Sequence, residues 1–165
     1  MKKFELTSEF VTFLGKKLFR IKALISFGNV EEGELGGYVE KEENLSNDGD
    51  AWVYGNARVY GDARVCGNAR VYGDARVYGD AEVSGDAMVH GNADYATVQG
   101  FGSEYRTTTF FRTKAGDIGV RCGCFYGTLD DFRKKVKETH GDSKTAKEYL
   151  RVADLMEFRF SKEEV

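Results

Sequence analysis

The chain has 165 residues and a formal net charge of −3, so it is large enough for one core or two small ones. The mild acidity argues against a general binder of nucleic acid, and no apolar run reaches the length of a membrane span. Three cysteines, an odd number, argue against a disulfide framework.

Residues 1–32 are expected to form a β-hairpin cap. Apolar and polar residues alternate on both sides of Gly15, most regularly from Leu18 to Leu24. Such a hairpin would cover the open edge of the next unit, where unpaired strands invite aggregation. The charged start of the chain lacks the apolar core of a signal peptide, so we expect a cytoplasmic protein.

Residues 33–98 contain the most regular pattern, a six-residue repeat that predicts a β-solenoid. From Gly49 to Ala93 the unit Val-Tyr-Gly-Asp/Asn-Ala-Arg recurs without a gap. A glycine in every unit would cost an α-helix roughly 1 kcal/mol each time. In a β-solenoid, Val and Ala point inward from short strands, and the Gly-Asp or Gly-Asn pair turns the corner, where positive φ is cheap.

The unbroken repeat resembles that of the hexapeptide-repeat proteins. The resemblance implies a mainly β fold, a short left-handed parallel β-helix of about three coils with roughly 18 residues each. The first coil is expected to hold Val39, Leu45 and Val53, with two extra residues looping out near Asn47 and Asp48. Because hexapeptide-repeat proteins usually assemble around a threefold axis, the resemblance also implies a homotrimer or a multiple of it.

The outward side chains of the repeat fall on three faces, two of which are rich in aromatic and Arg residues. Such ladders suit exposed strands in general, and they also suit a subunit interface. The predicted oligomer interface consists of Trp52, Tyr54, Arg70, Tyr72, Met88 and His90. The second aromatic face consists of Tyr38, Glu40, Arg58, Tyr60, Arg76, Tyr78, Asp94 and Ala96.

Residues 99–165 are expected to form a small ββαα unit. Strong β-formers at 107–112 and 118–122 flank a turn and predict a hairpin. Thr128 is a good N-cap for a first helix, with Asp131 completing a capping box. A second helix is expected at about 144–158. This unit would cap the last coil or carry the activity.

The whole chain also resembles a group of uncharacterised bacteriophage and prophage proteins. The resemblance is carried by the opening LFRIKALISFGNVEEGELGGYVEKEENLS, the repeats, and the later stretch GSEYRTTTFFRTKAGDIGVRCGCFYGTLDDF. It implies a phage-encoded protein in the cytoplasm of a bacterial cell. It transfers no catalytic residue.

Two candidate chemistries find little support in the sequence. Many hexapeptide-repeat acyltransferases use a solenoid histidine as general base, but His90 fills a slot that Tyr takes in other units, so a surface or interface role is favoured. Zinc needs four ligands, and Cys122 and Cys124 have no second pair at suitable spacing. We therefore expect ordinary buried thiols, no metal and no cofactor.

The third candidate is an anion site in the C-terminal unit. Arginines and threonine hydroxyls cluster on the predicted hairpin, a helix N-terminus attracts phosphate, and aromatic rings stack on a base. The predicted ligand-binding residues are Tyr105, Arg106, Thr107, Thr108, Thr109, Arg112, Arg121, Phe125 and Thr128. The alternative is that these arginines pair with acidic residues on a solvated sheet.

Because no catalytic constellation is evident, the sequence favours a non-enzymatic oligomeric binding protein. It would sequester a nucleotide-derived or other anionic small molecule and so counter the defence signalling of the host cell. The alternative is a protein-binding inhibitor or scaffold, whose anchors would be Trp52, Tyr54, Tyr72 and Met88. An acyltransferase is the third hypothesis.

Overall fold

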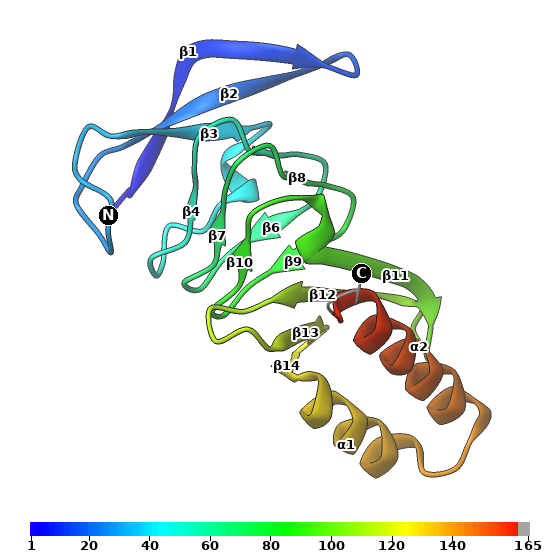
Figure 1. The fold of residues 1–165 in the computed structure, drawn as a ribbon. Coiled ribbons are helices and arrows are strands. Elements are labelled where there is room, and N and C mark those ends of the chain that lie inside the picture. The colour runs from blue at the N-terminus through cyan, green and yellow to red at the C-terminus, as the bar shows by residue number, and fades with distance from the viewer. Residues whose placement is uncertain (162–165) are drawn as a thin grey trace.

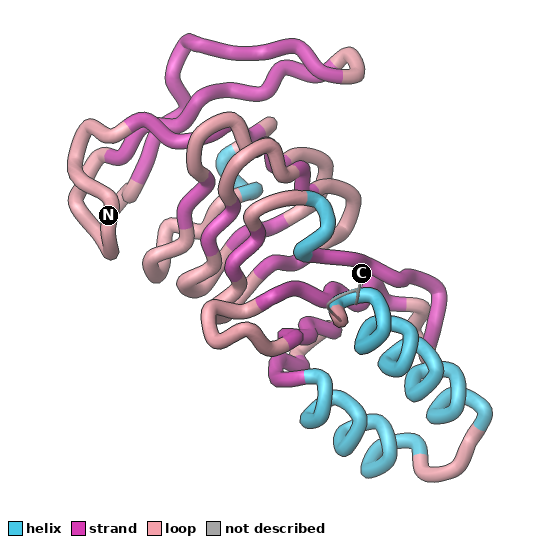
Figure 2. The backbone as a smooth tube through the Cα atoms, in the orientation of Figure 1, coloured by secondary structure: helices cyan, strands magenta, loops and turns pink. Residues whose placement is uncertain are grey.

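The computed structural model describes residues 1–161 and shows a mostly β chain laid out end to end (Figure 1). An N-terminal hairpin, a column of short stacked strands, and a sheet covered by two helices follow one another along the molecule (Figure 2). Each unit packs on the next.

The hairpin consists of β1 (Phe4–Phe13) and β2 (Lys16–Ala23), which pair antiparallel. Leu14 and Gly15 form the turn, both with positive φ. On its other side β2 pairs with β3 (Leu35–Val39), the first strand of the solenoid. The predicted hairpin and its place over the first solenoid strand are therefore confirmed.

The solenoid is built from strands of two residues that form parallel ladders. These strands are β4 (Trp52–Val53), β5 (Arg58–Val59), β6 (Arg64–Val65), β7 (Arg70–Val71), β8 (Arg76–Val77), β9 (Glu82–Val83) and β10 (Met88–Val89). The ladders run β3-β5-β8, β4-β7-β10 and β6-β9, and the residues that face each other are those expected from the repeat. Tyr38 pairs with Arg58, two residues beyond the usual 18-residue spacing, as expected if two extra residues loop out near Asn47 and Asp48.

The inward Val and Ala side chains of the solenoid are completely buried and form one continuous core. Glycine is needed at the corners because successive corners stack closely. Gly67 has φ of +66°, and a Cβ there would lie 2.9 Å from the backbone nitrogen of Gly85. Any other residue at Gly67 would meet both an unfavourable φ and the next corner, whereas at Gly55 and Gly79 the positive φ alone favours glycine.

Lys3 enters the first end of the solenoid and is almost completely buried there. Its ammonium donates hydrogen bonds to the carbonyl oxygens of Ala51, at 2.8 Å, and Gly49, at 3.3 Å. It also lies over the ring of Phe27. Burial lowers the pKa of Lys3 from 10.5 to about 8, against the opposing attraction of Asp50.

This shift predicts that stability rises with pH between about 8 and 10.5. Over that range the unfolded chain holds the Lys3 proton and the folded chain releases it, so deprotonation favours folding by roughly 1–3 kcal/mol in total. Urea denaturation at pH 7, 8 and 9 of the wild type and of Lys3→Met isolates the effect. The wild type should gain stability relative to the variant as the pH rises, and parallel profiles would contradict the assignment.

The C-terminal sheet is larger than the predicted hairpin. It contains β11 (Tyr95–Phe101), β12 (Arg106–Arg112), β13 (Ile118–Cys122) and β14 (Phe125–Thr128) in antiparallel order. The strand expected to end the solenoid at residue 98 is part of β11, which bonds to β12, so the boundary at 98/99 was wrong. β14 was not predicted, because it is a short strand that directly follows a two-residue turn.

The two helices cover the outer face of this sheet (Figure 1). They are α1 (Leu129–His140) and α2 (Lys144–Phe160), and the predicted capping box of Thr128 and Asp131 is present. Ser143 caps α2. Two short 3-10 helices, η1 (Glu42–Asn44) and η2 (Asn92–Asp94), complete the fold.

The inner face of the sheet caps the last turn of the solenoid. Phe111 points into the solenoid core, whereas Phe110, one residue earlier, packs with the helices. Hydrogen bonds join the two units as well, since the backbone N–H of Glu82 donates to Thr109 and that of Lys114 donates to Asp86. The sheet itself is therefore the cap, and the helices lie behind it.

Candidate functional site

The predicted ligand-binding residues do not form one site, because side chains on β12 and β13 alternate between two covered faces. Thr109 and Arg121 are paired residues that both contact Glu82, so they lie on the solenoid side. Thr108 contacts Cys122 on the helix side. Three of the predicted residues, Arg106, Thr107 and Arg121, line a hollow of about 240 Å³ on the solenoid side, whereas Thr108 is buried on the helix side.

All three predicted arginines have carboxylate partners, and for Arg112 and Arg121 the pair joins the sheet to the solenoid. Arg112 pairs with Asp94 at 3.0 Å, and Arg121 pairs with Glu82 at 3.1 Å. Both arginines are half-buried and link the sheet to the solenoid. They are removed from the candidate site, because their ion pairs are less exposed than the pair of Arg106 with Glu104.

The threonines and Tyr105 also fall outside the site. Thr108 and Thr109 are buried, and Thr107 lies on the solenoid side with Thr109. Thr128 is engaged in the capping box with Asp131, whose carboxylate accepts from the helix N-terminus and would repel an anion there. Tyr105 is exposed in the turn between β11 and β12.

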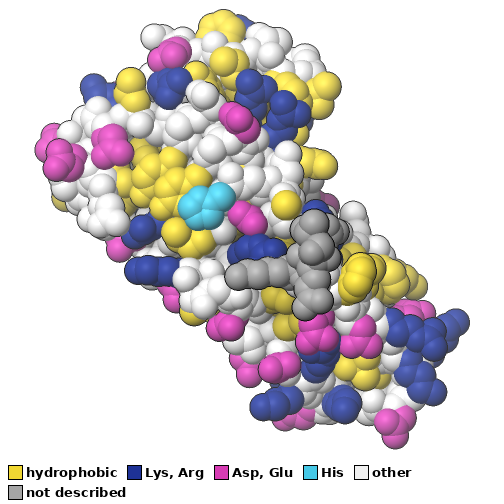
Figure 3. Space-filling model, viewed as in Figure 1, with side chains coloured by type: hydrophobic (Ala, Val, Ile, Leu, Met, Phe, Trp, Pro, Cys, Tyr) yellow, Lys and Arg dark blue, Asp and Glu magenta, His cyan; other side chains and the backbone are white. Residues whose placement is uncertain are grey.

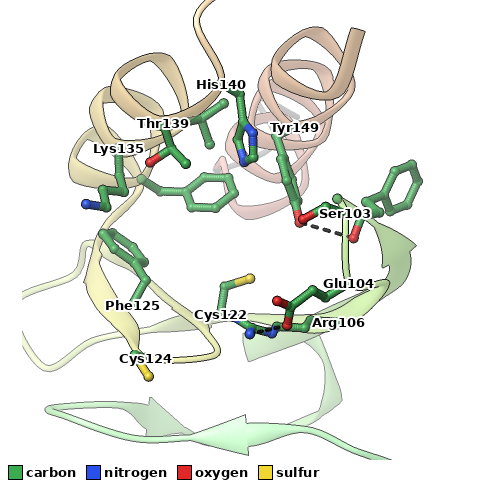
Figure 4. Close-up of a pocket in the computed structure, with 14 residues that line it drawn as sticks. Ser103, Glu104, Arg106, Cys122, Cys124, Phe125, Lys135, Thr139, His140 and Tyr149 are labelled. Carbon is green, nitrogen blue, oxygen red and sulfur yellow. Dashed lines mark hydrogen bonds and ion pairs between the residues drawn. The ribbon is translucent and has the colours of Figure 1, made fainter. Parts of the chain in front are cut away.

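Arg106 and Phe125 do share a cavity, which has a volume of about 310 Å³ and lies between the outer face of the sheet and the two helices. We call it the sheet–helix cavity. The residues that line it are Phe101, Gly102, Ser103, Glu104, Arg106, Cys122, Cys124, Phe125, Phe132, Lys135, Val136, Thr139, His140 and Tyr149. Figure 4 shows His140 and Tyr149 reaching down from the helices towards Arg106 on the sheet.

Apolar rings make up most of the cavity wall. Phe132 packs edge-on against Tyr149, with ring centres 5.6 Å apart, and Phe125 lies 5.9 Å from Phe132. Burial raises the pKa of the Tyr149 hydroxyl, which stays protonated and donates to the carbonyl of Phe101 at 3.1 Å. These contacts hold the Phe132 ring between Phe125 and Tyr149.

Polar groups enter the cavity from both sides: Thr139, His140 and the Tyr149 hydroxyl come from the helices, and Ser103, Glu104 and Arg106 come from the sheet side. Arg106 forms an ion pair with Glu104, drawn as a dashed line in Figure 4. Figure 4 also shows the sulfur of Cys122 pointing into the cavity and the amine of Lys135 pointing away from it. Arg106 is therefore the cation that faces the cavity.

Sequence reasoning missed the helix side of this cavity. It predicted the two helices but gave no site role to Tyr149 or His140. A signal was present, since Gly102 allows the turn after β11 to approach Tyr149. A Cβ at Gly102 would overlap the Tyr149 hydroxyl, and the positive φ of Gly102 also requires glycine.

The predicted oligomer interface loses one of its members, because Trp52 is completely buried. Phe27 and Phe4 fold over the indole, with ring centres at 5.3 and 6.4 Å. The placement of Trp52 on an outer surface was therefore wrong. The repeat does direct this side chain outward, but the N-terminal segment covers it.

The other aromatic members of that face form a stacked ladder. Tyr54 stacks on Tyr72 at 4.5 Å, and Tyr72 stacks on His90 at 4.7 Å. Figure 3 shows hydrophobic atoms and a histidine side by side over the part of the solenoid that contains β4, β7 and β10. The ladder is accessible and flat, as an interface requires.

The cysteines are all free thiols. Cys66 and Cys122 are half-buried, and Cys124 is exposed in the turn before β14. The expectation of a buried thiol was wrong for Cys124, because the tight turn between β13 and β14 holds it at the surface. Within residues 1–161, no group of three His, Cys, Asp or Glu side chains is placed to hold a metal ion.

In the part of the chain that the structure describes, no helix is both long and apolar enough to cross a membrane. No curated protein matches the chain. A family model for the YdcK β-solenoid repeat matches residues 51–67, 63–79 and 69–83. Together with the parallel ladders of β3 to β10, this similarity identifies the chain as a β-solenoid repeat protein.

Proposed function

We propose that this protein binds a small anionic molecule in the sheet–helix cavity and sequesters it without turnover. The observation that carries the proposal is the combination of one cation, Arg106, with the aromatic wall of Phe125, Phe132 and Tyr149. A volume of about 310 Å³ suits a small ligand with a flat apolar part and a single anionic group.

Glu104 marks the place that the anion would take. Its carboxylate lies against the Arg106 guanidinium, at the mouth of the cavity. Both side chains are exposed, so their ion pair contributes little to stability and can open at small cost. A ligand carboxylate or phosphate would displace Glu104 and gain a charge-assisted hydrogen bond to Arg106.

We further propose an assembly that presents several such cavities. The stacked ladder of Tyr54, Tyr72 and His90 supports a subunit interface, because accessible aromatic side chains are enriched at interfaces. Following the hexapeptide-repeat resemblance, the solenoid would be left-handed, with about three coils, and the assembly a homotrimer. A protein partner on the same ladder is the alternative occupant.

The resemblance to phage proteins supports a biological role for binding alone. A phage protein that holds a nucleotide-derived signal of the host cell keeps that signal from its effector. Such a role needs affinity and copy number, and it needs no catalytic group. We therefore propose that the ligand is a nucleotide derivative in the cytoplasm of the infected cell.

Arg106→Ala should weaken ligand binding by about tenfold, because a charged hydrogen-bond donor in the cavity is lost. Glu104→Gln should strengthen binding a few-fold, since roughly 0.2–1 kcal/mol of competing ion pair is removed. Native mass spectrometry of the protein with a defined mixture of nucleoside monophosphates and cyclic dinucleotides measures the bound mass and the number of protomers together.

Arg121→Ala is the matched control, because Arg121 is a similar ion-paired residue on the solenoid side of the sheet. It should leave the bound mass unchanged. The sheet–helix cavity is excluded as the site if Arg106→Ala and Arg121→Ala lose bound mass equally. It is also excluded if none of the proteins binds a ligand.

A further inference from the structure

The second aromatic face of the solenoid carries a stacked ladder that stops one ring early. Tyr60 stacks on Tyr78, with ring centres 5.4 Å apart and planes 9° from parallel. The next position in this series, 18 residues after Tyr78, is Ala96. On the neighbouring face the equivalent third position is His90, which stacks on Tyr72.

The missing ring leaves one side of Tyr78 open. Tyr60 is only 9% exposed because Phe13 of the hairpin covers it, whereas Tyr78 is 54% exposed. Within residues 1–161, no aromatic ring stacks on the second face of Tyr78. Ala96 belongs to β11 and packs towards the helices. The solenoid therefore presents an uncovered ring at the end of a rigid stack.

A groove of about 500 Å³ lies at this position, between the hairpin turn and the start of β11. We call it the open-rung groove. Its lining residues are Phe13, Leu14, Tyr60, Arg76, Tyr78, Asn92, Tyr95, Ala96 and Thr97. In Figure 1 the hairpin of β1 and β2 projects beyond the solenoid on the side where β8 and β11 lie. The groove shares no lining residue with the sheet–helix cavity.

We propose that the open-rung groove is a second binding site, in which a flat aromatic ring of a ligand stacks on Tyr78 as the third rung. Aromatic side chains bind flat rings without requiring a particular pattern of hydrogen bonds. The ladder is held in place before the ligand arrives, because Tyr60 stacks on one face of Tyr78 and Phe13 packs against Tyr60. Little ordering cost then remains for binding.

The polar groups of the groove select a ring that carries an anionic group. The guanidinium carbon of Arg76 lies over the Phe13 ring, 4.7 Å from its centre, and Arg76 is the cation that lines the groove. Asn92 accepts from the backbone N–H of Arg76 at 2.8 Å, and Tyr95 donates to the Arg76 carbonyl. These contacts fix the strand that carries Arg76 and Tyr78.

The ligand class is thus a planar aromatic or heteroaromatic ring with a phosphate or carboxylate within reach of Arg76. A nucleotide and an aromatic acid share this chemistry. Adenosine monophosphate and indole-3-acetate serve as the two probes, and inorganic phosphate serves as the probe without a ring. Titrations of the isotope-labelled full chain, followed by NMR, report which backbone amides respond.

We expect saturable shifts at the amides of Tyr78 and Thr97 with at least one ring-bearing probe and none with phosphate alone. Tyr78→Phe, which keeps the ring, should bind within about twofold of wild type, and Tyr78→Ala should bind about tenfold more weakly. Thr97→Tyr, which adds a ring at an exposed position of the groove, should also reduce binding. His90→Ala, at the end of the other ladder, is the control and should change nothing.

The result that overturns the proposal is binding to Tyr78→Ala as tight as to wild type, or shifts confined to the sheet–helix cavity with both probes. The Arg106→Ala variant separates the two sites. If Arg106→Ala loses the amide shifts at the sheet–helix cavity but keeps those at Tyr78 and Thr97, the open-rung groove binds the probe independently. Absence of shifts at Tyr78 with both probes excludes it, whatever happens at Arg106.

Discussion

Replacing Trp52 with alanine is expected to lower the free energy of unfolding by about 3–5 kcal/mol. The indole is completely buried, and Phe4 and Phe27 enclose it at the junction of the hairpin and the solenoid. Little can collapse into the space, because the adjoining backbone of Gly36 already lies against the ring. Urea denaturation measures the loss of stability. It is followed by far-ultraviolet circular dichroism because Trp52 is the only tryptophan, so the variant has no tryptophan fluorescence to follow.

Tyr54→Ala is the matched control, because Tyr54 lies two residues further on and remains half-buried at the start of the exposed ladder. It should cost about 1 kcal/mol of stability and affect assembly instead. If instead the Trp52→Ala protein is stable but fails to assemble, Trp52 belongs to the subunit interface, as the repeat alone predicts.

Trp52 shows where a repeat pattern is informative and where it is silent. The pattern fixes which side chains point out of the solenoid, and the observed ladders agree with it from Tyr38 to Met88. It contains no information on what covers those side chains. That depends on Phe4 and Phe27, which are distant in sequence and belong to a segment without a repeat.

The candidate site was predicted only in part for a similar reason. Alternation along β12 separates Thr108 from Thr109 and could be deduced from the sequence. The sheet, however, is covered on both faces, by the solenoid and by the helices, so neither face is open as a solvated hairpin would be. Only Arg106 and Phe125 remain, where the sheet meets the helix ends.

The rest of the sheet–helix cavity comes from long-range packing. Tyr149 reaches the cavity because α2 folds back over the sheet and its hydroxyl finds the carbonyl of Phe101, 48 residues earlier in the chain. Local helix patterns predict that Tyr149 is buried, and this is correct. They do not predict that its polar end borders a cavity.

Phe111→Ala is expected to destabilise the protein by about 3–5 kcal/mol and to loosen the last solenoid turn first. The Phe111 ring is completely buried in the solenoid core and is the side chain through which the sheet closes it. Gly119 on the neighbouring strand makes room for it, since a Cβ there would overlap the ring. Without the ring, the sheet would be held by the hydrogen bonds of Thr109 and Asp86 and by the ion pairs of Arg112 and Arg121.

Hydrogen exchange measured by NMR tests where the loosening occurs. In Phe111→Ala the backbone amides of Glu82 and Lys114, which bond across the junction, should exchange faster than in the wild type. Phe110→Ala is the matched control, because that ring is equally buried but packs with Phe132 and the helices. Its main effect should fall on the amides of α1 and α2.

The comparison decides whether the solenoid and the sheet unfold as one unit. A repeat column exposes an unpaired edge and an apolar core at its end, so it depends on its cap. If Phe111→Ala leaves the amide of Glu82 fully protected, the cap is not closed by this ring and the two units are held together otherwise. If protection is lost at Glu82 while α1 and α2 stay protected, one aromatic side chain couples the repeat to the sheet that forms the candidate site.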